Sequence, residues 1–489
     1  MLTTLLIVLP FIGAALSIAS GANNARKVAL ATTVIEFILA LFAYKTYITN
    51  PQDALLVTNV AWSSALNTNF HVSMDGISLL MVLLTSLLTP FIVLSSFSKE
   101  YGNSRSFYAL VLTMQAALVG VFTAMDGLLF YVFWELALIP IWFICLLFGG
   151  EGRQRITFKF FIYTLFGSLF MLAALIYLYN HAGSSFDIEA LYRAGRSLEN
   201  WEQTMIFWML FLAFAIKMPV FPFHTWQPDT YVNAPTQGTM LLSGIMLKMG
   251  TYGLIRWLMP MISLEVAREN GKIAIILSVI SIVYASLIAI AQKDFKRMIA
   301  YSSIAHVGLI AAGILAWNIQ GIQGGLVQML AHGINVIGLF FIYDIIASRL
   351  NTGEMSEMGG IRGVAPKFAL MFLIVLLGSV ALPLTNGFVG EFLLLNGLFQ
   401  HNFWLAVFGG LTVILGAVYM LRGYQTMMLG ETTARTSVFA DLTNNEKWIL
   451  IPICILIIAF GVYPKPILDL TEPSVKALMD GVANGWTVK

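Results

Sequence analysis

The chain has 489 residues, of which 58% are hydrophobic and only 11% are charged, and its mean hydropathy is +0.83. Soluble globular proteins carry about 25% charged residues, so this composition excludes a soluble domain and indicates a chain that crosses a membrane many times. The net charge of +2 comes without a basic cluster, which excludes a nucleic-acid-binding surface. We therefore expect the partners of this protein to lie in the lipid bilayer.

Apolar stretches of about 20 residues recur along the chain, and an α-helix needs this length to cross the hydrocarbon core. Membrane-spanning β-strands need only about 10 residues, so the pattern predicts helices and excludes a β-barrel. The two cysteines, Cys145 and Cys454, lie in separate apolar stretches. We interpret them as small core residues rather than a disulfide or ligands of zinc or an iron–sulfur cluster, and we expect no cofactor or metal in this chain.

The predicted fold class is an all-α polytopic membrane protein with about fourteen transmembrane helices in a single transmembrane domain, residues 1–489. The first apolar stretch lacks the basic region and cleavage site of a signal peptide, so we expect a retained helix. In chain order, the predicted spans are 2–20, 27–48, 76–97, 105–124, 127–148, 155–180, 204–232, 236–259, 273–292, 298–317, 321–347, 366–400, 403–428 and 447–464.

The seventh and twelfth predicted helices are each interrupted by proline and glycine. The seventh contains Pro219 and Pro222 in KMPVFPFHTW, and the twelfth contains Pro383 in LPLTNGFVGEF. Proline lacks a backbone N–H and cannot continue a regular helix, so both helices are predicted to be broken. Broken helices in corresponding places are typical of transporters built from inverted repeats.

The two breaks lie five helices apart, which predicts two inverted five-helix repeats. We place the first repeat at residues 105–260, helices four to eight, and the second at 261–430, helices nine to thirteen. The remaining parts are the N-terminal helices at 1–104 and the C-terminal helix and tail at 431–489. Sequence identity between the two repeats is weak, so this division depends on the paired breaks.

The lysines and arginines of the loops predict the orientation, because they favour the cytoplasmic side of a membrane. Odd-numbered loops and their helix ends hold sixteen of them, whereas the even-numbered side holds nine. The nine are Lys45, Arg193, Arg196, Arg256, Arg268, Lys272, Lys465, Lys476 and Lys489. Both termini are therefore expected on the non-cytoplasmic side of the membrane.

Six ionisable residues are predicted to lie within the membrane on six different helices. They are Glu135, Lys217, Lys248, His306, His332 and Glu391. Glu135 is eight residues into its predicted helix, which places it about 12 Å deep at 1.5 Å per residue. A lysine at mid-membrane costs about 2.5 to 3.5 kcal/mol, so these residues need partners or a task. Their spread over many helices is typical of a polar row across the protein and not of one ligand cage.

Proton transfer is the chemistry that such a row can perform. Burial disfavours the charged forms of lysine and carboxylate, so the distance between Glu135 and Lys217 would control their affinity for protons. Histidine passes protons near neutral pH, and a broken helix exposes carbonyls that hold water. The alternatives are a static ion pair for Glu135 and Lys217, interhelical hydrogen bonds for the histidines, and a helix cap for Glu391. His224, among the prolines, is either a relay or a support for the break.

Four segments together resemble the antiporter-like subunits of respiratory complex I and its relatives, over nearly the whole chain. They are FWELALIPIWF, AFAIKMPVFPFHTWQPDTYVNAPTQGTMLLSGIMLKMGTYG, QKDFKRMIAYSSIAHVGL and LPLTNGFVGEF. The resemblance implies that Glu135 and Lys217 form an ion pair, that Lys248 is the central proton carrier, and that Glu391 is the exit-side group. His306 and His332 would continue the axis between them. Glu391 stands where sister subunits generally carry lysine.

The resemblance also implies partners. NADH, flavin, iron–sulfur clusters and quinone would belong to other membrane and peripheral subunits of complex I, and sister antiporter-like subunits would be neighbours in a bacterial plasma membrane. Two positions depart from the family: Tyr231 stands where histidine is common, and Leu384 where glycine is frequent. A subunit of a cation/proton antiporter, a membrane-bound hydrogenase module and a static scaffold are the alternative functions.

Overall fold

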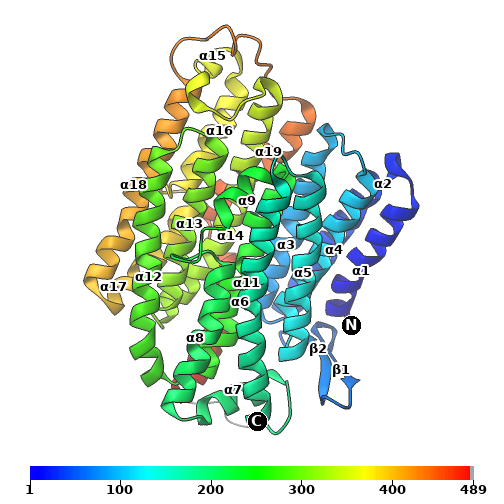
Figure 1. Ribbon diagram of the computed structural model, residues 1–489, viewed down its shortest axis with the longest axis vertical. Coiled ribbons are helices and arrows are strands. Elements are labelled where there is room, and N and C mark those ends of the chain that lie inside the picture. The colour runs from blue at the N-terminus through cyan, green and yellow to red at the C-terminus, as the bar shows by residue number, and fades with distance from the viewer. Residues whose placement is uncertain (485–489) are drawn as a thin grey trace.

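The computed structural model describes residues 1–484 and consists of one bundle of long helices (Figure 1); Lys489, counted above for orientation, lies outside this range. Within it, eleven helices are long and apolar enough to cross a membrane. They are α1 (Leu2–Ala19), α2 (Ala22–Thr49), α3 (Gly76–Ser95, extended by a 3₁₀ turn), α4 (Ser104–Thr123), α5 (Gly127–Phe148), α6 (Arg153–His181), α12 (Leu264–Ala291), α13 (Phe295–Ile314), α14 (Ile319–Leu350), α18 (Phe403–Met428) and α19 (Asn444–Val462).

Three further segments lie where spans were predicted, and each is irregular. In the first, α8 (Asn200–Lys217) and α9 (Gln227–Asn233) flank a non-helical stretch. In the second, α10 (Thr236–Leu241) and α11 (Leu247–Gly253) are joined and followed by π-helical turns. In the third, α16 (Pro366–Ser379) and α17 (Asn386–His401) are separated. Both predicted breaks are present, whereas the total number of spans and the repeat boundaries stay predictions.

The polar segments contain structure that the sequence interpretation left as loops or tail. Residues after α2 form a hairpin of β1 (Val57–Ser63) and β2 (Thr68–Ser73), with Val57 opposite Ser73. The other additions are the helices α7 (Ile188–Ser197), α15 (Ile361–Val364) and α20 (Lys465–Asn484). The sequence interpretation relied on apolar stretches long enough to span a membrane. These elements are too short or too amphipathic to form such stretches, so they were not predicted.

The bundle has two distinct ends, which we name the hairpin end and the α15 end. The hairpin and α7 lie at one end and α15 at the other, and Met1 and the last described turn of α20 lie toward the hairpin end (Figure 1). The Met1 amino group contacts Val57 O at 3.4 Å. Asp187, the N-cap of α7, lies 3.4 Å from Nδ1 of His71 in the hairpin, and this contact lowers the pKa of the Asp187 carboxyl. The Lys- and Arg-rich loops are at the α15 end.

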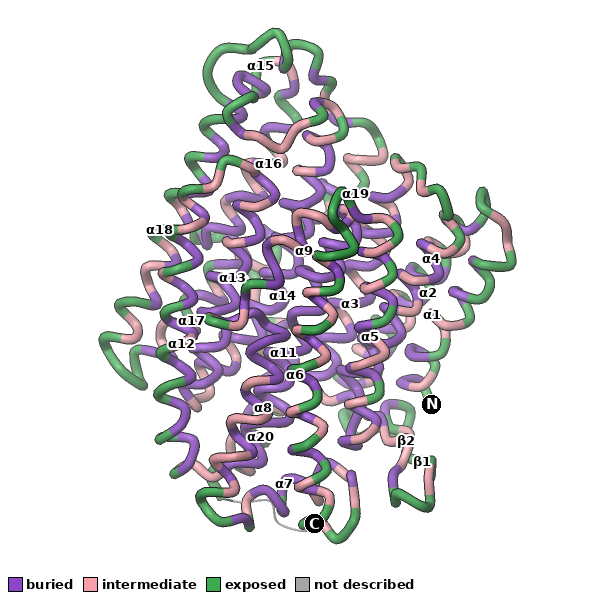
Figure 2. The backbone as a smooth tube through the Cα atoms, viewed as in Figure 1, coloured by how far each residue is buried: buried purple, intermediate pink, exposed green. Residues whose placement is uncertain are grey.

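The interior of the bundle is centred on α14. In the apolar part of α14, 94% of the residues are buried inside the protein. The corresponding share is 28% for α18 and for α19, which lie on the outside of the bundle. The burial pattern in Figure 2 agrees, with buried backbone concentrated in the middle of the bundle. Polar side chains on α14 and its neighbours are therefore shielded from lipid, as functional groups within a membrane require.

Candidate functional site

The first break, residues 218–226, is held in place by side chains rather than by helix hydrogen bonds. Trp226 donates from Nε1 to Ile216 O at 2.9 Å, which satisfies a carbonyl that the broken helix leaves free. Pro219 and Pro222 lie in this stretch, as predicted. His224 is buried against the ring of Tyr284, and its Nδ1 has no hydrogen-bond partner among residues 1–484. Its ring contacts are with Phe221 and Tyr284, neither of which belongs to the ionisable row, and its role as a relay or as a support for the break stays a prediction.

Lys217 ends α8 with its ammonium group buried and without a hydrogen-bond partner in the described chain. Its Nζ lies 5.3 Å from the ring centroid of Trp134, and the charge of the adjacent Glu135 acts on it. Tyr131 and Ser168 lie beside the Glu135 carboxylate, whose Oε1 is unpaired. The described ion pairs within 4.0 Å do not include Glu135 with Lys217. The distance between the Lys217 nitrogen and the Glu135 carboxylate oxygens is therefore more than 4.0 Å. Their pairing stays a prediction.

Lys248 of α11, in contrast, has two polar contacts. Its Nζ donates to Ser243 O at 2.7 Å and lies 2.8 Å from Nδ1 of His332 on α14. A charged lysine is only a donor, so Nδ1 must then accept and the histidine proton must be on Nε2. Nε2 is 3.0 Å from Oγ of Ser303 on α13, which completes this arrangement. Three helices thus meet at one proton-bearing pair.

His306 and Glu391 form the second half of the row. Nδ1 of His306 lies 3.0 Å from Oε1 of Glu391, and both side chains are almost fully buried. The contact is at ion-pair distance but its angle is not that of a hydrogen bond, so Nδ1 remains without an aligned partner. Gln328 donates from Nε2 to the same carboxylate oxygen at 3.3 Å. Glu391 is the sixth residue of α17 and contacts other helices, which argues against the helix-cap alternative.

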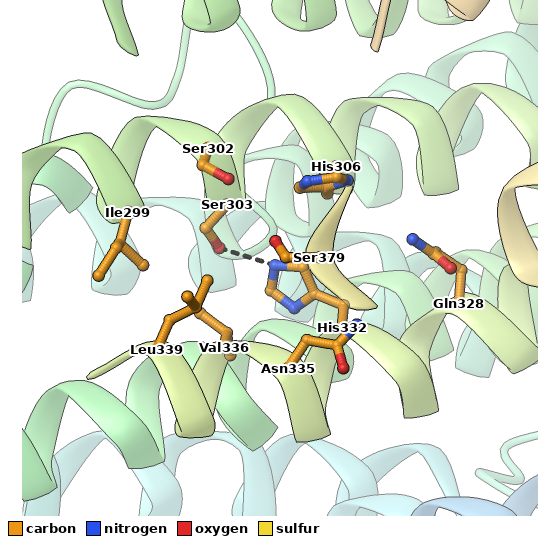
Figure 3. A pocket seen from close by; sticks show the side chains of 10 residues that line it. All are labelled: Ile299, Ser302, Ser303, His306, Gln328, His332, Asn335, Val336, Leu339 and Ser379. Atoms are coloured by element: carbon orange, nitrogen blue, oxygen red, sulfur yellow. Dashed lines mark hydrogen bonds between the residues drawn. The ribbon is translucent and has the colours of Figure 1, made fainter. Parts of the chain in front are cut away.

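The two halves meet at the histidines. The ring centroids of His306 and His332 are 6.1 Å apart, with the rings edge to face. A cavity of about 10 Å³ lies beside them, lined among others by Ser302, Ser303 and Gln328 (Figure 3). This volume is close to the minimum that a water molecule needs, and the lining offers several polar partners. The order in space is therefore Lys248, His332, His306 and Glu391.

Sequence reasoning missed three polar partners of this row. They are Ser243, Ser303 and Gln328, none of which was singled out as a candidate. Ser303 lies three residues before His306, and Gln328 lies four residues before His332. Residues three or four apart share one face of a helix, so this spacing was a usable signal. Ser243 carries no such signal, because its role depends on the π-helical turn Leu242–Met246.

The second break, residues 380–385, positions Glu391. It contains Pro383, as predicted, and two non-glycine residues with left-handed backbone, Ala381 at φ 56° and Leu384 at φ 73°. Leu384 is the position where the resemblance led us to expect glycine. Its left-handed φ gives that expectation a physical reason, because glycine adopts this conformation at little cost.

Comparison with known proteins identifies the family of this chain. The family described as NADH:quinone oxidoreductase/Mrp antiporter, TM matches residues 124–416. NADH-quinone oxidoreductase subunit M of Rickettsia typhi is 40% identical over 453 residues, which are 92% of this chain and 91% of the relative. NADH-ubiquinone oxidoreductase chain 4 of Marchantia polymorpha is 35% identical over 480 residues, 97% of this chain and 96% of that one.

Solved structures give the same result. A chain of respiratory complex I from Thermus thermophilus with bound NADH superposes with a TM-score of 0.91 at 30% identity, covering 99% of this chain and 100% of that one. A chain of the Mrp complex from Dietzia sp. DQ12-45-1b has a TM-score of 0.86 at 20% identity, covers 100% of this chain and 53% of that one, and shows the shared fold alone. This chain therefore belongs to the NADH:quinone oxidoreductase/Mrp antiporter transmembrane family, as a homologue of subunit M of NADH-quinone oxidoreductase.

Proposed function

We propose that this chain moves protons across the membrane as the antiporter-like M subunit of a proton-pumping NADH:quinone oxidoreductase. The observation that carries the proposal is the buried series Lys248, His332, His306 and Glu391, with contacts of 2.8 and 3.0 Å at its two ends and a ring separation of 6.1 Å between them. A static core would gain nothing from four ionisable groups in line, because each is costly to bury. A proton path requires such a series.

Lys217 and Glu135 act in this proposal as the switch. When the two groups approach, the carboxylate stabilises the charge of the lysine, and when they separate, burial favours the neutral lysine. Moving one charge against 100 mV requires about 2.3 kcal/mol, and closing a desolvated ion pair is a source of that order. The open gap between the two groups is compatible with the released state of the switch.

The proposed partners follow from the relatives. Other subunits would bind NADH, flavin, iron–sulfur clusters and quinone, and this chain would hold none of them. Sister antiporter-like subunits would be its neighbours in a bacterial plasma membrane, with water and protons at both mouths. Both termini would then lie on the non-cytoplasmic side, with the Lys- and Arg-rich α15 end facing the cytoplasm.

Substitution of the two buried lysines tests the proposal. In the assembled complex, Lys217→Ala and Lys248→Ala should each lower proton translocation at least about tenfold, since positioned proton carriers contribute on the order of 10² or more. Proton uptake into vesicles during NADH oxidation is the measurement. Lys45→Ala is the control, because this lysine of α2 is exposed. A complex that assembles and pumps normally with both alanines would make the chain a scaffold.

Co-purification tests a second alternative, a subunit of a cation/proton antiporter, which has the same fold. Recovery of the tagged chain with flavin and iron–sulfur subunits is the expected result. Recovery with antiporter subunits alone would overturn the assignment to NADH:quinone oxidoreductase.

A further inference from the structure

A second set of buried charges lies at the α15 end, outside the row described above. Asp344, near the end of α14, pairs with Lys99 at 3.2 Å. The Asp344 side chain is only 7% exposed, whereas the Lys99 side chain is 31% exposed. The pair therefore has one side in the protein and one side within reach of water.

Lys296 of α13 is the third charge of this group. It is buried, and its Nζ donates to Val232 O at 3.1 Å and to Ala234 O at 2.8 Å. The Val232 carbonyl belongs to the last turn of α9 and the Ala234 carbonyl follows that helix, so Lys296 holds the point where the broken seventh segment meets the eighth. The charge of Asp344 also acts on Lys296. The carboxylate thus stands between an exposed and a buried ammonium group.

Polar groups lead inward from this cluster. Tyr101 donates to Gln237 Oε1 at 2.6 Å, and Gln237 donates to Ser95 Oγ at 3.4 Å. Burial, reinforced by the Asp344 carboxylate, raises the pKa of the Tyr101 phenol, so the phenol keeps its proton. Ser243 is six residues after Gln237, about 9 Å along the helix.

Ser243 connects this approach with the row. Its Oγ lies 3.2 Å from Oγ of Ser303, and its carbonyl accepts from Lys248. Ser303 in turn contacts His332. Hydrogen bonds thus join Tyr101, Gln237 and Ser95 on the side of the cluster, and Ser243 and Lys248 on the side of the row. Water would have to carry the proton along the stretch of α10 between Gln237 and Ser243.

We propose that Asp344 is the proton-loading group of this chain at the α15 end, an inference that rests on the proposed proton translocation. Its carboxylate takes up one proton from water, which releases Lys99, and then gives that proton up along α10 toward neutral Lys248, which becomes charged. The carboxylate returns to its pair with Lys99. Asp344 is thus a residue of the proton path and not only a link between helix ends.

A nearby ion pair shows what a purely structural pair looks like in this fold. Arg349, also near the end of α14, lies 2.6 Å from Glu446, with both side chains about equally shielded at 14% and 15% exposure. Arg349 is held further by Asp441 O at 3.2 Å, and Glu446 caps α19. Neither residue adjoins a polar route to Lys248. Glu446→Gln is therefore the matched control for loss of a semi-buried ion pair.

The test compares Asp344→Asn, the double variant Asp344→Asn with Lys99→Gln, and Glu446→Gln in the whole complex. The readouts are NADH oxidation by quinone and proton translocation into vesicles, as a function of pH on the α15 side. The charged or titratable groups that face Asp344 are Lys99, Lys296, Tyr101 and Tyr343.

We expect Asp344→Asn and the double variant to pump at least fivefold more slowly and to lose the dependence on pH of the α15 side, with Glu446→Gln like the unmodified complex. If the double variant pumps normally, the loss in Asp344→Asn came only from the unpaired Lys99, and the proposal is overturned. Normal pumping by Asp344→Asn also overturns it. If Asp344→Asn does not assemble, the pumping rate of the double variant tests the proposal in its place. Normal pumping by Lys248→Ala would instead remove the proposed function itself.

Discussion

Lys217 and Lys248 are both buried, yet their ammonium groups have different surroundings. Lys248 contacts a carbonyl oxygen and an imidazole nitrogen, so its charge is partly solvated by the protein. Lys217 faces the ring of Trp134 and no acceptor among the described residues. The charge of Lys217 therefore depends on the approach of Glu135, which is the property that a switch needs, whereas Lys248 is placed to hand a proton on.

Leu384 allows a prediction on a single residue. Its φ of 73° costs roughly 1–2 kcal/mol for an L-residue, and glycine would avoid most of this at an entropic cost of about 0.5–1 kcal/mol. Leu384 is 68% exposed, so little packing is lost. Leu384→Gly should raise the apparent melting temperature of the complex slightly. Leu382→Gly, at an ordinary φ nearby, should lower it; equal loss in both variants would contradict the argument.

At the scale of elements, α17 lies unusually close to α14 through glycines. A Cβ on Gly324 would lie 2.6 Å from Leu394 N, and a Cβ on Gly390 would lie 2.9 Å from Gln328 Cα. Neither position has room for a side chain. This close approach brings Glu391 of α17 within reach of His306 and Gln328, so the second break and the glycines together aim the end of the row.

Gly390→Ala should therefore push α17 away from α14 and weaken the contact between His306 and Glu391. We expect proton translocation to fall severalfold, because small displacements in a positioned site are costly to rate. The control is Gly410→Ala on α18, where a Cβ would meet nothing within 4 Å. Proton pumping by purified complexes is the measurement. Equal rates in the two variants would show that the close packing of α17 does not position Glu391.

At the scale of the whole molecule, the chain ends and the hairpin share one end of the bundle and the Lys- and Arg-rich loops the other. Labelling of single cysteines tests the predicted orientation, and both native cysteines are buried, which keeps the background low. Arg362→Cys in α15 should react with an impermeant thiol reagent from the cytoplasmic side. Lys476→Cys in α20 should react only from the opposite side. The reverse pattern would invert the proposed direction of transport.

The class of fold, the approximate positions of the long helices and both breaks could be predicted from the sequence alone. Lipid forces this result, because a membrane helix must be long, apolar and internally hydrogen-bonded, and these properties are local. The hairpin, α7 and α20 were missed, since their patterns are short and amphipathic. The sequence also predicts six ionisable residues within the membrane, and this placement stays a prediction.

The contacts among those residues, in contrast, follow from the tertiary fold and could not be predicted from the sequence. Lys248 and His332 are 84 residues apart, and Gln328 and Glu391 are 63 residues apart, so no local pattern predicts their contact. The structure also brings Asp344 to Lys99, at 3.2 Å. Contacts of this kind depend on which faces of helices far apart in sequence pack together. The close packing of side chains around α14 sets them, and the local hydrophobic pattern of each helix does not specify it.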